Sequence, residues 1–185
     1  MRPLPLAMPL TAVACLVAAA LGTAQIERLD LSQMVSKTDN AVFGTITNKD
    51  VIRIDHPKDG PELYFTTLTI EGRSLRNDEA VTVDVTFAGG FIDSEHGVHN
   101  SEAPSADDVR VGNRVVAFYK WVDNMGGDLA GNALYAAHGG LFRTFEARNG
   151  TVVQGRGEGY AVPTNVGLAA LKQQIVTLVN GPKPK

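Results

Sequence analysis

The stretch AVTVDVTF, residues 80–87, constrains the fold most, because apolar and polar side chains alternate along it without a break. Successive side chains of a β-strand point to opposite faces of its sheet, so this alternation predicts a strand with one buried face. Its apolar side chains are expected to point toward a core: Val81, Val83, Val85 and Phe87. Its polar side chains are expected to face solvent: Thr82, Asp84 and Thr86.

Other segments share the composition of strands, with many β-branched and aromatic residues between turn-forming ones. They are residues 41–54, 63–75, 114–121, 133–137, 141–148 and 151–154. The segment RVVAFYKW, residues 114–121, is nearly all apolar and predicts a strand covered on both faces. Asn149-Gly150 predicts a hairpin with a two-residue turn, because both turn residues would need a positive φ.

Helices are predicted only at the two ends of this strand-rich region. The first covers residues 29–37, with Asp30 as its N-terminal cap. The second follows Thr164 or Asn165 as cap and ends at Gly181, and its apolar face is Leu168, Leu171, Ile175 and Leu178. This order favours a mainly β fold, a small antiparallel OB-like barrel with a short N-terminal helix and a C-terminal amphipathic helix. A closed barrel also leaves no exposed strand edges.

The first 24 residues have the pattern of a secretory signal peptide. Arg2 provides the positive start, an apolar run follows, and Gly22-Thr23-Ala24 is a small-residue cleavage site. The alternative of lipidation at Cys15 is less favoured, because the apolar run continues past that cysteine. We therefore expect an exported protein, secreted or periplasmic, with a signal peptide at 1–24, one domain at 25–181 and a flexible tail at 182–185.

Composition excludes several classes of function. Cys15 is the only cysteine, so a chain cleaved before Gln25 has neither a thiol nor a disulfide. The formal charge of the whole chain is −3, and loss of Arg2 makes it −4. An acidic protein is a poor partner for nucleic acid or anionic lipid. No second apolar run has the length of a transmembrane helix, about 20 residues.

Several short phrases carry a resemblance to known proteins. They are NAVFGTI (40–46), TLTIE (67–71), the diglycine Gly89-Gly90 and VGNRVVAF (111–118). In this order the chain resembles a group of uncharacterised exported bacterial proteins with an OB-fold-like barrel. It is also similar to netrin-like domains and tissue inhibitors of metalloproteinases. Those inhibitors depend on an N-terminal cysteine and on disulfides, so their inhibitory residues have no counterpart here, and an inhibitor-like module stays only as a second alternative.

The segment from Phe87 to Asp108 holds His96 and His99 among five carboxylates, without lysine or arginine. Two imidazoles with carboxylates can bind zinc, so His96, His99, Glu95 and Asp93 are candidate ligands of a divalent metal. A metal-binding protein or metal-dependent hydrolase is therefore the alternative function. The segment is also rich in Asp, Ser, Asn and Pro, which an exposed loop explains without any metal. The preferred interpretation is a loop without a cofactor.

No recognisable set of catalytic residues emerges from the sequence. The serine-nucleophile motif Gly-x-Ser-x-Gly is absent, His56 and His138 are interpreted as structural, and GRGEG (155–159) precedes no helix start. The long connection after the strand at 114–121 provides a candidate binding surface of Trp121, Met125 and Asp128. The leading hypothesis is therefore an exported, non-enzymatic domain that binds an unknown protein or envelope component.

Overall fold

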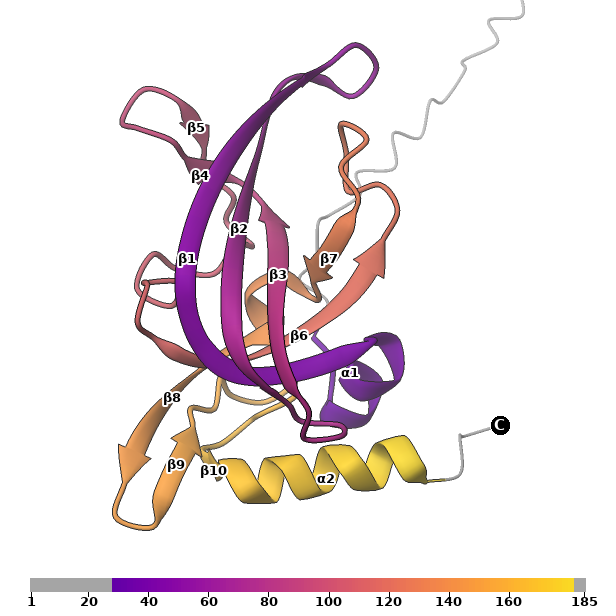
Figure 1. The fold of residues 1–185 in the computed structure, drawn as a ribbon, viewed down its shortest axis with the longest axis vertical. Helices are drawn as coiled ribbons and strands as arrows, with labels where there is room; N and C mark the ends of the chain where they lie inside the picture. Colours follow the sequence, from indigo (N-terminus) through magenta and orange to yellow (C-terminus); the bar gives the residue numbers. More distant parts are fainter. Residues whose placement is uncertain (1–27, 182–185) are drawn as a thin grey trace, which may run out of the picture.

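Five strands form a closed barrel in the computed structural model, which describes residues 28–181 (Figure 1). The predicted signal peptide and the predicted tail at 182–185 lie outside the described residues. The five strands are β1 (Asn40–His56), β2 (Gly60–Ser74), β3 (Ala80–Ala88), β6 (Arg114–Val122) and β7 (Gly131–Leu134). Between residues 28 and 181, no helix is long and apolar enough to cross a membrane.

The barrel closes because β1 pairs with β2 along one edge and with β6 along the other. The strand order around the barrel is β1-β2-β3-β7-β6, returning to β1. Four of these pairings are antiparallel, and β3 pairs with β7 in parallel. The prediction of a small β-barrel is confirmed, but its strand pairing is mixed and not wholly antiparallel. The reason is that β7 follows β6 in a hairpin and returns beside β3.

The inside of the barrel is one apolar core, called the barrel core here. It includes Val83, Val85 and Phe87, while Val81 is partly buried against it, as the alternation predicted. Thr82 and Asp84 are exposed as expected, but Thr86 is buried. It lies between neighbouring strands on both sides, and its hydroxyl is 2.9 Å from that of Thr67. The solvent-facing prediction for Thr86 was therefore wrong.

A second layer covers the outside of β6 and contains a second apolar core, called the outer core here. Its elements are α1 (Leu31–Lys37), β8 (Leu141–Ala147), β9 (Gly150–Val153), β10 (Val166–Gly167) and α2 (Leu168–Asn180). Both helices lie at the lower end of the barrel in Figure 1. Along β6, Val115 and Ala117 belong to the barrel core, whereas Val116 and Phe118 belong to the outer core. The predicted strand with two covered faces is confirmed.

The helix predictions are correct in position but not in every cap. Asp30 caps α1 as expected, and its carboxylate accepts the backbone N–H of Gln33. The caps proposed for α2 are wrong, because residues 166–167 pair with β9 and the helix starts only at Leu168. The Asn165 side chain instead accepts the backbone N–H of Gly155.

Two local details differ from the sequence-based expectations. The β8–β9 hairpin is present, but Ala147 pairs with Gly150, and of the expected turn residues only Gly150 has a positive φ (107°). The two-residue Asn-Gly turn was therefore wrong, and Gly150 belongs to the strand after the turn. The predicted strand at 133–137 ends early, because the chain turns into a 3₁₀ helix, η1 (Ala137–Gly140).

Candidate binding groove at the end of the barrel

The acidic segment after β3 forms a small hairpin that projects from the barrel (Figure 1). Its strands are β4 (Gly90–Phe91) and β5 (Gly97–Val98). Gly90 pairs with Val98, and Phe91 pairs with Gly97. The sequence predicted an exposed loop here, and the segment is indeed largely exposed. The strand pairing adds a fixed register, which places the apolar side chains of the hairpin at defined positions.

The diglycine Gly89-Gly90 joins this hairpin to the barrel. Gly89 donates its N–H to the carbonyl of Tyr64, and its own carbonyl accepts the hydroxyl of Thr66 at 2.6 Å. Gly90 has φ 132°, and a Cβ there would lie 2.2 Å from Thr66 Oγ1. Any larger residue would clash at this contact, so the close approach of the hairpin to β2 requires glycine.

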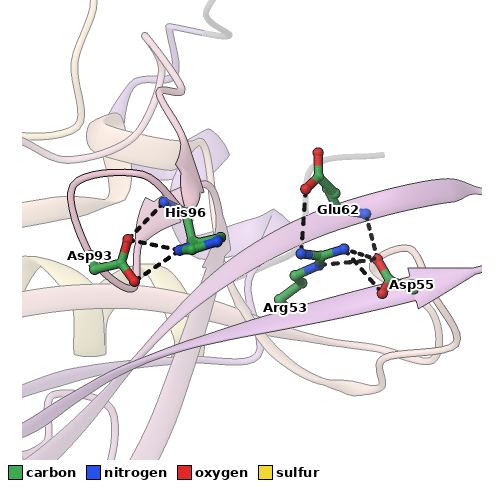
Figure 2. A network of polar contacts seen from close by, with 5 residues as sticks. All are labelled: Arg53, Asp55, Glu62, Asp93 and His96. Carbon is green, nitrogen blue, oxygen red and sulfur yellow. Dashed lines mark hydrogen bonds and ion pairs between the residues drawn. The ribbon is translucent and has the colours of Figure 1, made fainter.

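The turn of the hairpin is organised by Asp93, as Figure 2 shows. Its Oδ1 accepts the backbone N–H groups of Glu95 and His96 at 2.8 and 2.9 Å. Nδ1 of His96 lies 2.9 Å from both carboxylate oxygens. The N–H of Glu95, followed by the two contacts from His96, lowers the pKa of Asp93. These bonds fix the hairpin turn.

The four predicted metal ligands do not form one cluster. Asp93 and His96 are in contact, but Glu95 reaches Asp93 through its backbone N–H. His96 directly precedes β5 and His99 directly follows it, and His99 lines the groove described next. Within residues 28–181, no group of three or more His, Cys, Asp or Glu side chains is arranged to hold a metal ion.

A groove of about 460 Å³ lies between the hairpin and the end of the barrel, and is called the mouth groove here. Its lining includes Tyr64 and Phe65 of β2 and Ala88 at the end of β3. Val98 and His99 after β4, and Met125 from the β6–β7 loop, also line it. Three segments far apart in the sequence thus form one concave surface of the size that small ligands and side chains occupy.

Three exposed apolar side chains lie on the hairpin. They are called the apolar rim here: Phe91, 53% exposed, Ile92, 52%, and Val98, 46%. Val98 lines the groove, whereas Phe91 pairs with Gly97, one position from the Gly90–Val98 pair, and therefore points to the other face of the hairpin. Gly97 leaves room for the ring of Phe91, since a Cβ there would be 2.5 Å from Phe91 Cδ1. Such a cluster on a projecting hairpin leaves apolar area in water, which is typical of interaction sites.

The β6–β7 loop is held against the tip of the β1–β2 hairpin. Asp59 donates its backbone N–H to His56 Nδ1 at 3.1 Å, so Nε2 carries the ring proton of a neutral His56. Nε2 then donates to Asp128 at 3.2 Å, and the Asp59 carboxylate accepts the N–H of Gly127. These bonds fix the position of the loop that carries Met125. His56 therefore helps to hold the loop that contributes Met125 to the groove lining.

A second polar network lies on the β1–β2 hairpin, next to the groove wall (Figure 2). Arg53 contacts Asp55 at 3.1 Å and Glu62 at 3.3 Å. Asp55 also accepts the backbone N–H of Glu62, and this bond stabilises the positive φ of Glu62, 61°. That N–H, and then the guanidinium of Arg53, lower the pKa of Asp55. The positive charge of Arg53 is therefore neutralised locally by two carboxylates.

The three predicted binding residues have different places. Met125 lines the mouth groove, whereas Asp128 holds the loop through His56. Trp121 is 53% exposed, so it is not a core residue, and it lies outside the groove lining. Sequence reasoning missed the apolar rim. The available signal was Phe91-Ile92, two adjacent large apolar residues directly after a diglycine in an otherwise polar segment.

The arrangement can hold an apolar group in the mouth groove and extend the contact along the rim. The exposed Glu95 of the hairpin turn can attract positive charge, whereas Glu62 and Asp93 already contact Arg53 and His96. Comparison of the chain with protein-family models, with curated proteins and with solved structures finds no match.

Proposed function

We propose that this chain is an exported, non-enzymatic binding protein that holds an extended segment of a partner protein. The segment carries apolar side chains, which occupy the mouth groove and cover the apolar rim. It also carries lysine or arginine, which lie near the surrounding carboxylates. Export rests on the signal-like residues 1–24. The single observation that carries the binding proposal is the apolar rim beside a groove of matching character.

Burial of apolar area provides the favourable free energy. Phe91, Ile92 and Val98 are each about half exposed, so a bound segment can remove much of their surface from water. Each 100 Å² of apolar surface removed contributes roughly 2.5 kcal/mol before the costs of association. A hairpin held by its diglycine contact and its Asp93 turn is already ordered, so less entropy is lost on binding.

Charge supports the choice of a basic segment. Asp93 and Glu95 lie in the hairpin turn, and no lysine or arginine occurs between Asn77 and Val109. Arg53, the nearby cation of the β1–β2 hairpin, is paired with Asp55 and Glu62. A partner with lysine or arginine beside its apolar residues would therefore meet a complementary potential, which favours fast and specific association.

The strand order of the barrel adds a further argument by analogy. Its order, with β3 parallel to the last barrel strand, resembles that of OB-fold barrels. Those barrels commonly bind ligands through the loop between the first two strands and the loop between the last two. Here these are the β1–β2 hairpin and the β6–β7 loop, and both contribute to the mouth groove. The acidic character of the surface favours a basic peptide over nucleic acid.

Two synthetic peptides test the proposal by isothermal titration calorimetry. One alternates leucine with lysine, and the other alternates leucine with glutamate at the same length. We expect the lysine peptide to bind at least about tenfold more tightly, and its affinity to fall as salt is added. Equal affinities for the two peptides would contradict the proposed role of the carboxylates.

Two matched variants locate the site. Val98→Ser removes an apolar side chain of the rim, whereas Val111→Ser removes one that is similarly exposed, 54% against 46%, but lies before β6. We expect Val98→Ser to weaken binding of the lysine peptide several-fold and Val111→Ser to leave it unchanged. Equal losses from the two variants would place the peptide elsewhere or make its binding non-specific.

A further inference from the structure

A second, polar pocket lies beside η1 and the β8–β9 hairpin, and its lining does not overlap with that of the mouth groove. Its volume is about 230 Å³, and its lining includes His138, Arg143, Arg156, Tyr160 and Asp108. Pockets for drug-sized ligands span roughly 300–1,000 Å³, so this one suits a smaller molecule.

The β8–β9 hairpin brings two arginines of the pocket together. Arg143 lies on β8, and its carbonyl accepts the backbone N–H of Gln154, which directly precedes Gly155-Arg156. The GRGEG stretch, residues 155–159, therefore turns back toward β8 and does not lead into a helix. Two guanidinium groups thirteen residues apart in the chain line the same pocket.

Arg156 is held in place by other parts of the protein. Its Nε donates to the carbonyl of Leu141 at 2.9 Å, and its Nη2 donates to Asp108 at 3.1 Å. The guanidinium also lies over the ring of Phe142, 5.8 Å from the centroid. A guanidinium has five N–H donors, so several remain after these two bonds. A fixed arginine with free donors can bind an oxyanion at little entropic cost.

Arg143 differs because its side chain is exposed. No hydrogen bond or ion pair of its guanidinium occurs between residues 28 and 181. It therefore brings an uncompensated positive charge to the pocket, where Arg156 is balanced by Asp108. Arg28 adds a third guanidinium nearby, 5.6 Å from the centre of the Tyr160 ring. Cations outnumber the single carboxylate of the lining.

His138 and Tyr160 form a fixed wall of the pocket. Nδ1 of His138 lies 3.1 Å from the carbonyl of Glu102, which can only accept, so Nδ1 carries the proton. In the neutral ring, Nε2 accepts the hydroxyl of Tyr160 at 3.2 Å. Both ring nitrogens are therefore engaged within the protein, and the arginines are left as the groups that contact a ligand.

We propose that this pocket binds a small oxyanion, a carboxylate or phosphate group, between Arg143 and Arg156. The planar guanidinium suits both groups, because each presents two oxygens to its paired N–H donors. This site is separate from the mouth groove and does not depend on peptide binding.

Calorimetric titration of the folded chain with sodium phosphate, and separately with sodium citrate, tests the site, with sodium chloride at matched ionic strength as control. Binding of phosphate alone, citrate alone or both supports the site and identifies the preferred oxyanion. Binding of neither at millimolar concentration would overturn the proposal.

Variants separate the pocket from general charge effects. Arg143→Gln should weaken binding about tenfold, since a charge-assisted hydrogen bond contributes that much. Arg148→Gln removes the same charge from the tip of the same hairpin, outside the pocket, and should leave binding unchanged. Asp108→Asn removes the competing negative charge but keeps a side-chain oxygen that can accept from Arg156, so it should strengthen binding. Equal losses from the two arginine variants, or weaker binding by Asp108→Asn, would refute the assignment.

Discussion

Replacing Leu171 by alanine should detach part of α2 from the barrel, because this residue is 1% exposed and belongs to the outer core. Leu178 is a matched control, since it is the same residue type seven positions further along the same helix but 39% exposed. Truncation of a buried leucine costs about 3 kcal/mol of folding free energy, which includes the cavity left behind. At Leu178 we expect about 1 kcal/mol, because no enclosed cavity forms.

Urea denaturation followed by circular dichroism measures both effects. With a denaturant slope of about 2 kcal/mol per M, the unfolding midpoint should fall by about 1.5 M for Leu171→Ala and about 0.5 M for Leu178→Ala. The wild-type slope should be retained by both variants, since otherwise the midpoints are not comparable. Equal midpoint shifts would refute the placement of Leu171 inside the outer core and of Leu178 outside it.

Further predictions concern the barrel, the response to acid and the hairpin turn. Val83→Asp should destabilise the protein by about 3 kcal/mol or more, since it places a charge in the barrel core. Thr82→Asp should cost much less, because Thr82 is exposed. Similar losses of melting temperature for the two variants would show that the buried and exposed faces of β3 are reversed. Hydrogen bonds from Lys172 on α2, and then from Arg73 on β2, lower the pKa of Asp78. The ionised Asp78 therefore stabilises the fold above the usual aspartate pKa near 4, and this stabilisation is lost as pH falls through the lowered pKa of the folded state. The variant Asp78→Asn should therefore show a smaller loss of stability on acidification, and an unchanged loss would contradict this role. Zinc or EDTA should leave the melting temperature unchanged, and His96→Ala with His99→Ala should leave the fold intact; zinc bound at one equivalent in the wild type but not in this variant would support the metalloprotein alternative instead.

The parts of the fold that depend on local pattern were predictable from the sequence. The alternation at Val83 and Val85 assigned the faces of β3, and Asp30 marked the start of α1. The buried Thr86 was not predictable in this way, because its burial depends on the strands on either side. The parallel pairing of β3 with β7 is likewise a property of the closed barrel.

The site was less predictable, because it combines residues that no local pattern connects. Met125 was singled out for its loop and His99 for its metal-like spacing, yet they line one groove. What brings them together is the diglycine contact of Gly90 with Thr66 and the contact of His56 with the β6–β7 loop. Such contacts between distant segments fix the geometry of a binding site but leave little trace in sequence periodicity.

The proposed binding surface is the mouth groove with its apolar rim. Backbone amide chemical shifts, recorded while the leucine–lysine peptide is added to the isotope-labelled protein, test it most directly. We expect the largest shifts at Phe65, Phe91, Val98, His99 and Met125, and little change at Arg143 and Tyr160 of the polar pocket. Shifts concentrated at the polar pocket, or spread evenly over the exposed carboxylates, would contradict it.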